Sequence, residues 1–245
     1  MARPKITLYV DTVSPFAYEA YYILRNEDVF KACDITYVPI FLGGLMQKCG
    51  NIAPIKIKNK DKWMSIERLR WARHFGIPMT TALPPDFPAP TLPIMRALCV
   101  VAASDPEPGQ PRLTRALDTF FAQHWAHGAA THKPEVLRAT LAGLFGEAEA
   151  ERILQESTTP QTKQALAANT DRAFDSGAFG LPWLECTTAQ GDKTEGFWGV
   201  DHLGQVVQFL GLDPLVGKRR GQGDGDGNGN RDGERSGSEG WKALL

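Results

Sequence analysis

Near its N-terminus the chain passes from an apolar strand almost directly into a helix, and few folds place these two elements in this way. Residues 6–10, Ile-Thr-Leu-Tyr-Val, have the β-branched and aromatic composition of a strand. A helix then begins at Ser14-Pro15, where the serine can accept a free backbone N–H and the proline lacks one. Residues 35–40 have the composition of a second strand. Residues 5–41 therefore predict a βαβ unit with a right-handed crossover.

The complementary half of this pattern lies far along the chain. Residues 179–182 are Phe-Gly-Leu-Pro, and two strand-like runs and a helix follow them. The order βαβ and then ββα is that of a thioredoxin-type fold, which carries Cys-x-x-Cys at its first helix, facing a cis-proline loop. Here Ser14 and Ala17 occupy the two cysteine positions. The sequence thus predicts a site that lacks its own redox sulfur and can hold the thiol of another molecule.

Both features also have simpler interpretations. Ser14 and Pro15 are ordinary helix-capping residues, and Pro182 is acceptable as the first residue of a strand. Only their combination, in this order, favours a site.

A block of helices separates the two halves. The predicted helices cover residues 62–75, 91–103, 113–125, 134–145, 147–156 and 160–175, with a proline-rich loop at 84–90. Thr91 is expected to cap the second of these helices. The later strands cover residues 183–187 and 194–198, and a last helix covers 201–210.

The predicted fold class is therefore α/β, a thioredoxin-like fold with a large all-helical insertion. The thioredoxin-like domain occupies residues 5–60 and 177–212, and the helical insertion occupies residues 61–176. Residues 213–245 form a tail rich in glycine and aspartate, which predicts disorder.

Composition excludes several kinds of function. A net charge of -1 gives no reason to expect a nucleic acid or an anionic membrane as a partner. The apolar runs are too short to span a bilayer, and the early first strand leaves no room for a signal peptide. The four cysteines lack Cys-x-x-Cys spacing, which is typical of a reduced intracellular compartment. They are Cys33, Cys49, Cys99 and Cys186.

No metal site is predicted. Acidic and amide residues at 224–230 fall at EF-hand positions, but Arg235 stands where a bidentate glutamate is required. His124, His127 and His132 lie close in the sequence without a supporting cysteine or carboxylate pattern.

Several short stretches between residues 5 and 212 resemble one known family. They are Ser14-Pro15-Phe16, Gly50-Asn51-x-x-Pro54, Lys60 with Trp63-Met64, Gly76-Ile77-Pro78, Leu92-x-x-Met95-Arg96, Gly177-Ala178-Phe179-Gly180-Leu181-Pro182 and Gly199-x-Asp201. In this order and spacing the chain resembles kappa-class glutathione transferases and the related bacterial 2-hydroxychromene-2-carboxylate isomerases, which are DsbA-like proteins. The resemblance implies a cytosolic, mitochondrial or peroxisomal homodimer that binds glutathione.

Three positions depart from the kappa pattern. Val200 stands where a hydroxyl residue usually helps to hold the γ-glutamyl end of glutathione, and His202 stands where a basic residue often follows. Trp63 replaces the usual tyrosine. These departures predict a lower affinity for glutathione than the family pattern implies.

The chemistry requires a thiolate. A free thiol has a pKa of about 8.5, so ionisation near pH 7 needs about two units, or ~2.7 kcal/mol. A hydrogen bond from the Ser14 hydroxyl to the sulfur is worth ~1.5–3 kcal/mol, and the helix dipole adds ~0.3–1 kcal/mol. Ser14 is therefore the predicted catalytic residue, and Pro15 keeps the first helical position free of a competing N–H.

The expected binding residues surround Ser14. A cis-proline at Pro182 would turn the Leu181 backbone toward the cysteinyl part of glutathione. The last helix begins at Val200 and Asp201, where backbone N–H groups can receive a carboxylate and Asp201 can pair with the γ-glutamyl ammonium. Asp201 also fits a plain helix cap. The expected glutathione-binding set is Ser14, Pro15, Phe16, Asn51, Leu181, Pro182, Val200 and Asp201.

The electrophile is expected between this site and the helical insertion. Phe16, Trp63 and the loop at 84–90 would form apolar walls for it, and Lys60 would meet an anionic group of the substrate. The alternative for the lysine series at 56–62 is an ordinary solvated face.

Three functions remain open. The first is transfer of glutathione to small apolar electrophiles, with glutathione peroxidase activity as an accompanying possibility. The second is a glutathione-dependent isomerase, which the stretch Arg70-Trp71-Ala72 favours and which the mass of the product would distinguish. The third is a non-catalytic carrier of glutathione or hydrophobic ligands, which Val200 favours. A thiol–disulfide oxidoreductase is disfavoured, because Ser14 and Ala17 leave no redox pair.

Overall fold

The computed structural model describes residues 2–105 and 108–213, and its centre is a four-stranded sheet. The strands are β1 (Lys5–Val10), β2 (Asp34–Pro39), β3 (Trp183–Thr187) and β4 (Thr194–Trp198), in the order β2-β1-β3-β4. β1 and β2 are parallel, and the other two pairs are antiparallel. This confirms the predicted α/β, thioredoxin-like fold.

The strand register brings the predicted site together. β1 pairs with β3 so that Tyr9 lies opposite Trp183. Because this pair is antiparallel, the end of β1 lies beside the start of β3. The loop after β1, which leads to Ser14, and the loop before β3, which contains Pro182, therefore meet at the same end of the sheet.

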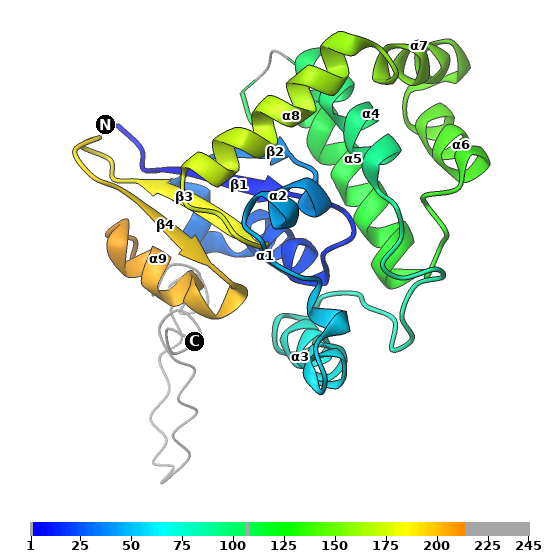
Figure 1. The fold of residues 1–245 in the computed structure, drawn as a ribbon. Coiled ribbons are helices and arrows are strands. Elements are labelled where there is room, and N and C mark those ends of the chain that lie inside the picture. The colour runs from blue at the N-terminus through cyan, green and yellow to red at the C-terminus, as the bar shows by residue number, and fades with distance from the viewer. Residues whose placement is uncertain (1, 106–107, 214–245) are drawn as a thin grey trace, which may run out of the picture.

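Most helices lie to one side of this sheet. Figure 1 shows α4 to α8 gathered beside β2, while α3 lies apart from them; α3 contacts α1 instead. The helices are α1 (Pro15–Asn26), α2 (Leu42–Lys48), α3 (Lys60–Phe75), α4 (Leu92–Ala103), α5 (Pro111–Phe121), α6 (Pro134–Phe145), α7 (Glu147–Ser157), α8 (Pro160–Asp175) and α9 (Leu203–Phe209). Within the described ranges, no helix has the length and apolar character needed to cross a membrane.

Three local predictions differ from the structure. Helix α2 was not predicted because its sequence, Leu-Gly-Gly-Leu-Met-Gln-Lys, contains two residues of low helix propensity. The helix predicted to end at residue 125 changes at Ala122 into a π-helical turn that ends at Ala126. The last helix begins as a 3₁₀ turn, Val200–His202, and only then continues as α9. The predicted tail and its acidic run lie outside the described residues, apart from Asp213.

Trp183 occupies the space that a side chain at position 196 would need. A Cβ added at Gly196 would approach Cζ2 and Cη2 of the Trp183 ring closer than 3.0 Å. The ring cannot readily move, because it is buried and its Nε1 donates a hydrogen bond to the Ser176 hydroxyl at 3.0 Å. Gly196 is therefore required where β4 crosses this indole.

Gly196→Ala is expected to lower the free energy of unfolding by ~1–3 kcal/mol, the usual cost of overpacking a core. Urea unfolding followed by circular dichroism measures the change. Gly143→Ala is the matched control, since Gly143 lies in α6 with no atom within 4 Å of an added Cβ. That control is expected to stabilise the protein by ~0.5–1 kcal/mol. Equal effects from the two variants would contradict this interpretation.

Candidate functional site

A cavity of about 750 Å³ lies at the end of the sheet where the two loops meet. This volume is within the range of ~300–1,000 Å³ that is typical of small-molecule sites. Five parts of the chain line it: the start of α1, residues between 41 and 55, residues of α3 between 60 and 71, the loop 87–91, and the residues 179–182 and 198–201 next to β3 and β4.

A second cavity, of about 710 Å³, lies at the opposite end of the sheet around Pro4 and Gln190. Two of its three charged residues, Asp28 and Lys31, pair with each other, and the predicted site residues Ser14 and Pro182 line the first cavity instead. We therefore place the candidate site in the first cavity.

Ser14 lines the first cavity as the N-cap of α1. Its Oγ accepts a hydrogen bond from the Ala17 N–H at 3.1 Å. The hydroxyl hydrogen has no acceptor among the described residues, so it is available to donate to a ligand. The capping interpretation and the functional interpretation are thus compatible, because the cap uses the oxygen and leaves the hydrogen free.

The loop from Asp11 to Ser14 is held from several directions. The Ser14 N–H donates to the Asp11 carbonyl at 3.1 Å, and the indole Nε1 of Trp125 donates to the Thr12 carbonyl at 2.9 Å. The Asp11 carboxylate accepts from the Val13 N–H at 3.2 Å and from the Leu42 N–H at 2.9 Å. The position of Ser14 is therefore fixed by segments distant in the sequence.

Thr91 corrects one prediction. It was expected to cap α4, but its side chain makes no capping bond. It instead bonds the buried Asp11 carboxylate. The reason is that the Asp11 carboxylate, which directly follows β1, competes for the Thr91 hydroxyl.

Burial raises the pKa of Asp11 from 3.8 to about 6, although the three hydrogen bonds oppose this increase. Because the folded pKa is the higher one, the stability that Asp11 contributes is greatest below its unfolded pKa and is lost as the pH rises through about 6. The difference of about two pH units corresponds to about 3 kcal/mol. The ionised carboxylate therefore opposes folding at neutral pH.

The loop before β3 closes the opposite side of the cavity. The Leu181–Pro182 peptide is cis, as the sequence led us to expect. The Pro182 carbonyl accepts from the Gly199 N–H at 3.1 Å. In the part of the chain that the structure describes, neither the N–H nor the carbonyl of Leu181 has a hydrogen-bond partner. An extended ligand can therefore pair with this backbone.

Asn51 and the segment after β4 form two further parts of the cavity wall. The Asn51 amide already donates to the Phe179 carbonyl at 3.1 Å, which leaves one of its two hydrogens for a ligand. Val200 is buried, and its backbone belongs to the short 3₁₀ turn. The Asp201 side chain is exposed and lies 3.4 Å from Nδ1 of His202.

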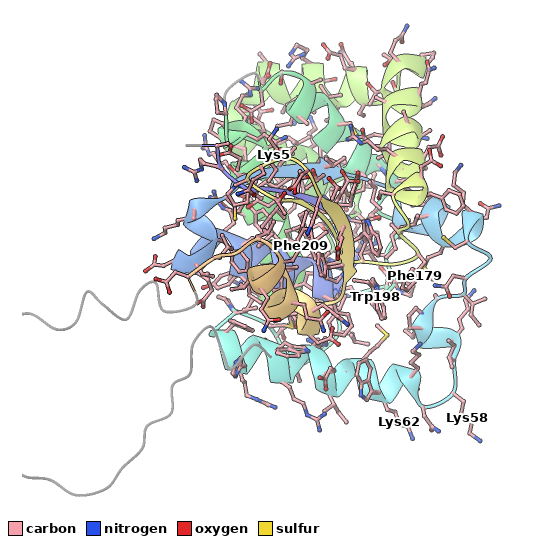
Figure 2. The ribbon with its side chains drawn as sticks, turned by 90° about the vertical axis from the view of Figure 1, so that its left-hand side faces the viewer. Lys5, Lys58, Lys62, Phe179, Trp198 and Phe209 are labelled. Atoms are coloured by element: carbon pink, nitrogen blue, oxygen red, sulfur yellow. The ribbon has the colours of Figure 1, made fainter. Side chains whose placement is uncertain are left out.

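The apolar part of the cavity is aromatic. The Phe16 and Trp63 ring centroids are 6.4 Å apart, and those of Phe179 and Trp198 are 5.0 Å apart. Figure 2 shows the second pair side by side on the edge that faces α3. Trp71, from the stretch that favours an isomerase, also lines the cavity.

Of the lysines at 56–62, one lies where it could contact a substrate, and others lie on a solvated face. Lys60 lines the cavity, and it forms no ion pair within the described ranges. Lys58 and Lys62 point away from the molecule into solvent in Figure 2. Glu67 also lines the cavity but is paired with Arg70 at 2.9 Å.

The described residues contain no group of three or more His, Cys, Asp or Glu side chains arranged to hold a metal ion. Burial lowers the pKa of His124 to about 4, and its ring contacts the Ala129 carbonyl and the Thr131 hydroxyl. The cysteines are free, and burial raises the pKa of Cys99 to about 12. Neither Cys99 nor His124 lines the cavity.

Sequence reasoning did not identify Asp11 or Trp125 as parts of the site. Asp11 carries a usable signal, because an acidic residue directly after a buried strand is unusual in a core. Trp125 carries none, since its contact with Thr12 depends on the docking of the helical block.

Comparison with known proteins assigns the fold to a family. Residues 5–211 match the DSBA-like thioredoxin domain. The chain therefore belongs to the family of proteins with this domain.

Within that family it is a distant homologue of kappa-class glutathione transferases. It is 28% identical over 217 residues to glutathione S-transferase kappa 1 of Caenorhabditis elegans, a match that covers 84% of this chain and 91% of that protein. It is 27% identical over 214 residues to human glutathione S-transferase kappa 1, covering 84% and 90%.

Solved structures support the same fold. A 2-hydroxychromene-2-carboxylate isomerase superposes with a TM-score of 0.67 at 21% identity, covering 90% of this chain and all of that one. The cytosolic disulfide reductase DsbM of Pseudomonas aeruginosa, solved with GSH, superposes with a TM-score of 0.53 at 16% identity, covering 84% and 97%.

Proposed function

We propose that this protein is a kappa-like glutathione transferase that activates the glutathione thiol through Ser14 for attack on small apolar electrophiles. The observation that carries this proposal is the free hydrogen of the Ser14 hydroxyl, at the N-terminus of α1 and in a cavity that the unpaired Leu181 backbone also lines. The distant homology to kappa-class enzymes supports glutathione as the co-substrate.

The proposed arrangement assigns each end of glutathione to one segment. The cysteinyl backbone pairs with Leu181 beside Pro182, which places the sulfur near Ser14, Pro15 and Phe16. The γ-glutamyl carboxylate meets the N–H groups at Val200, and its ammonium meets Asp201. The remaining N–H of Asn51 donates to the glycyl carboxylate.

The electrophile then occupies the aromatic half of the cavity. Phe16 and Trp63 cover its apolar part, and Lys60 meets an anionic group if the substrate has one. In the reaction the thiol proton leaves to solvent, the thiolate forms a bond to the electrophilic carbon, and the displaced electron pair leaves with the leaving group. With a hydroperoxide the same thiolate attacks one oxygen and breaks the O–O bond, which gives a sulfenic acid and releases the alcohol after protonation. A second glutathione then attacks the sulfenic sulfur, which forms the disulfide and releases water.

An ultraviolet titration tests the first step. Glutathione is added to the protein near pH 7, and thiolate absorbance is followed to saturation. Saturable thiolate absorbance supports an activated-thiol enzyme. Binding without thiolate supports the carrier function, which Val200 favours because it removes a hydroxyl from the γ-glutamyl end. The absence of binding contradicts the proposal.

A glutathione-dependent isomerase is the second candidate, and the position of Trp71 in the cavity wall favours it. In that reaction the thiolate adds to the substrate and leaves again, so the product has the mass of the substrate. Mass spectrometry of the product therefore distinguishes isomerisation from transfer, in which the mass increases by that of glutathione less the leaving group.

The homodimer and the compartment that the family resemblance implies belong to the same proposal. We propose a homodimer in a cytoplasmic, mitochondrial or peroxisomal environment that supplies reduced glutathione. Size-exclusion chromatography with light scattering measures the first property, and localisation of the tagged full chain measures the second.

A further inference from the structure

Asp11 connects three separate segments of the chain immediately below the site. Its side chain is fully buried and does not line the cavity. One carboxylate oxygen accepts from Val13 in its own loop, and the other accepts from Leu42 at the start of α2. The Thr91 hydroxyl, just before α4, bonds the same carboxylate. Val13, Leu42 and Thr91 all line the cavity.

The same residue also fixes Ser14 directly. The carbonyl of Asp11 accepts the Ser14 N–H at 3.1 Å, and the Val13 N–H bond closes the turn between them. A change in the side chain of Asp11 therefore acts on the backbone that carries the Ser14 hydroxyl. This contact is a positioning one, because Asp11 does not reach the cavity itself.

The arrangement matches an ionised carboxylate. Both oxygens face donors, and only the ionised form accepts at both without a hydrogen of its own. On β1, α2 and α4, the elements next to the groups that bond it, the titratable or charged side chains are Lys5, Tyr9, Lys48, Arg96 and Cys99. None of them contributes to the pKa of Asp11, which burial sets at about 6. Three hydrogen bonds, with no cation from the described part of the chain among the causes of its pKa, thus hold the ionised carboxylate in the interior.

We propose that Asp11 is a positioning residue whose ionised carboxylate holds the loop 11–14 so that the Ser14 hydroxyl points at the bound thiolate. This inference rests on the proposed function. A positioning role explains why a carboxylate that opposes folding at neutral pH is placed beside the site. The three hydrogen bonds of this carboxylate are made to segments that line the cavity.

The variant Asp11→Asn tests this inference by the sign of its effect. Asparagine has nearly the same shape, but its NH₂ group faces one of the donors and loses that bond. If Asp11 acted only through its charge, removing a negative charge near the site would lower the pKa of the bound thiol. If Asp11 acts by positioning Ser14, the pKa of the bound thiol rises instead. We expect a rise of about one unit, which is a tenfold smaller ionisation constant.

The measurement is thiolate absorbance of the glutathione complex of the full chain between pH 4.5 and 9. Wild-type absorbance is expected to fall more steeply than a single-proton curve below about pH 6, because protonation of Asp11 releases the loop. Asp11→Asn is expected to follow a single-proton curve with a raised midpoint. A lowered or unchanged midpoint overturns the inference.

Two further variants keep the test decisive. Asp105→Asn is the matched control. Asp105 is a buried carboxylate that accepts the Leu113 N–H at 2.9 Å and does not line the cavity. This variant is expected to leave the pKa of the bound thiol unchanged. If Asp11→Asn does not fold, Thr91→Val removes one of the three bonds to the same carboxylate. A raised thiol pKa in Thr91→Val supports the inference, and an unchanged value overturns it. A wild-type protein that forms no thiolate contradicts both the inference and the proposed function.

Discussion

Replacing Ser14 with alanine is expected to raise the pKa of bound glutathione by ~1–2 units and to reduce kcat/KM about 10–100-fold. The reason is the loss of one hydrogen bond to a charged sulfur, which is worth ~1.5–3 kcal/mol. The hydrogen that makes this bond has no other acceptor among the described residues. The thiolate titration gives the pKa, and initial rates with an aromatic electrophile give kcat/KM.

The control must account for the second role of Ser14 as the cap of α1. Ser14→Ala also removes the bond to the Ala17 N–H, which is expected to lower stability by ~1 kcal/mol. Thr159→Ala removes the corresponding cap of α8, where the hydroxyl accepts the Thr162 N–H at 3.3 Å. The two variants should lose similar stability, but only Ser14→Ala should change the thiol pKa. If the pKa of bound glutathione is the same in Ser14→Ala as in the wild type, Ser14 is only a helix cap.

Trp125→Phe is expected to lower the free energy of unfolding by ~2–4 kcal/mol. Trp125 is fully buried, and its ring packs edge-on against Phe87 at a centroid distance of 5.5 Å. Phenylalanine leaves part of this volume empty and leaves the Thr12 carbonyl without its 2.9 Å donor. A buried acceptor that loses its partner costs ~1–3 kcal/mol, and the residual cavity adds to this cost.

Urea unfolding followed by far-ultraviolet circular dichroism measures this change without relying on tryptophan fluorescence. Trp63→Phe provides the comparison, because Trp63 is 52% exposed at the cavity and its ring lies beside Phe16 rather than in the buried core. The expected change for Trp63→Phe is within about 0.5 kcal/mol. Similar losses in the two variants would show that the contact with Thr12 contributes little.

The sequence predicted the elements whose signals are local. Pro15, Pro134 and Pro160 each stand at the first position of a helix, so the starts of α1, α6 and α8 agree with the pattern. The four strands were predicted within one residue at each end, because their β-branched and aromatic runs are bounded by turns.

The remaining features depend on contacts between distant segments. α2 has two glycines, yet it begins where Leu42 donates to Asp11 and Phe41 donates to Thr170. The bond between Thr91 and Asp11 has the same origin. Propensity and periodicity describe single segments, so they do not predict which buried polar group will face another across the core.

In the candidate site, too, the local motifs were predicted and the contacts between distant segments were not. Ser14 and Pro182 were identified from the order of short motifs, and both line the cavity. The loop 87–91, with Phe87 and Thr91, also lines it but was predicted only as an apolar wall. Whether the cavity holds glutathione stays a prediction until the titration is made.

The antiparallel pairing of β1 with β3 makes this site a reporter of complete folding. Ser14 follows β1, whereas Leu181 precedes β3, and the two strands meet only after the intervening helices have been accommodated. A fragment that ends with α8, at Asp175, would contain Ser14 but lack the Leu181 backbone. A ligand that uses both sides binds the native chain alone, so it raises the free energy of unfolding of the whole chain by RT ln(1 + [L]/Kd). Thermal stabilisation by a ligand of this cavity would therefore measure occupancy and the integrity of the sheet together.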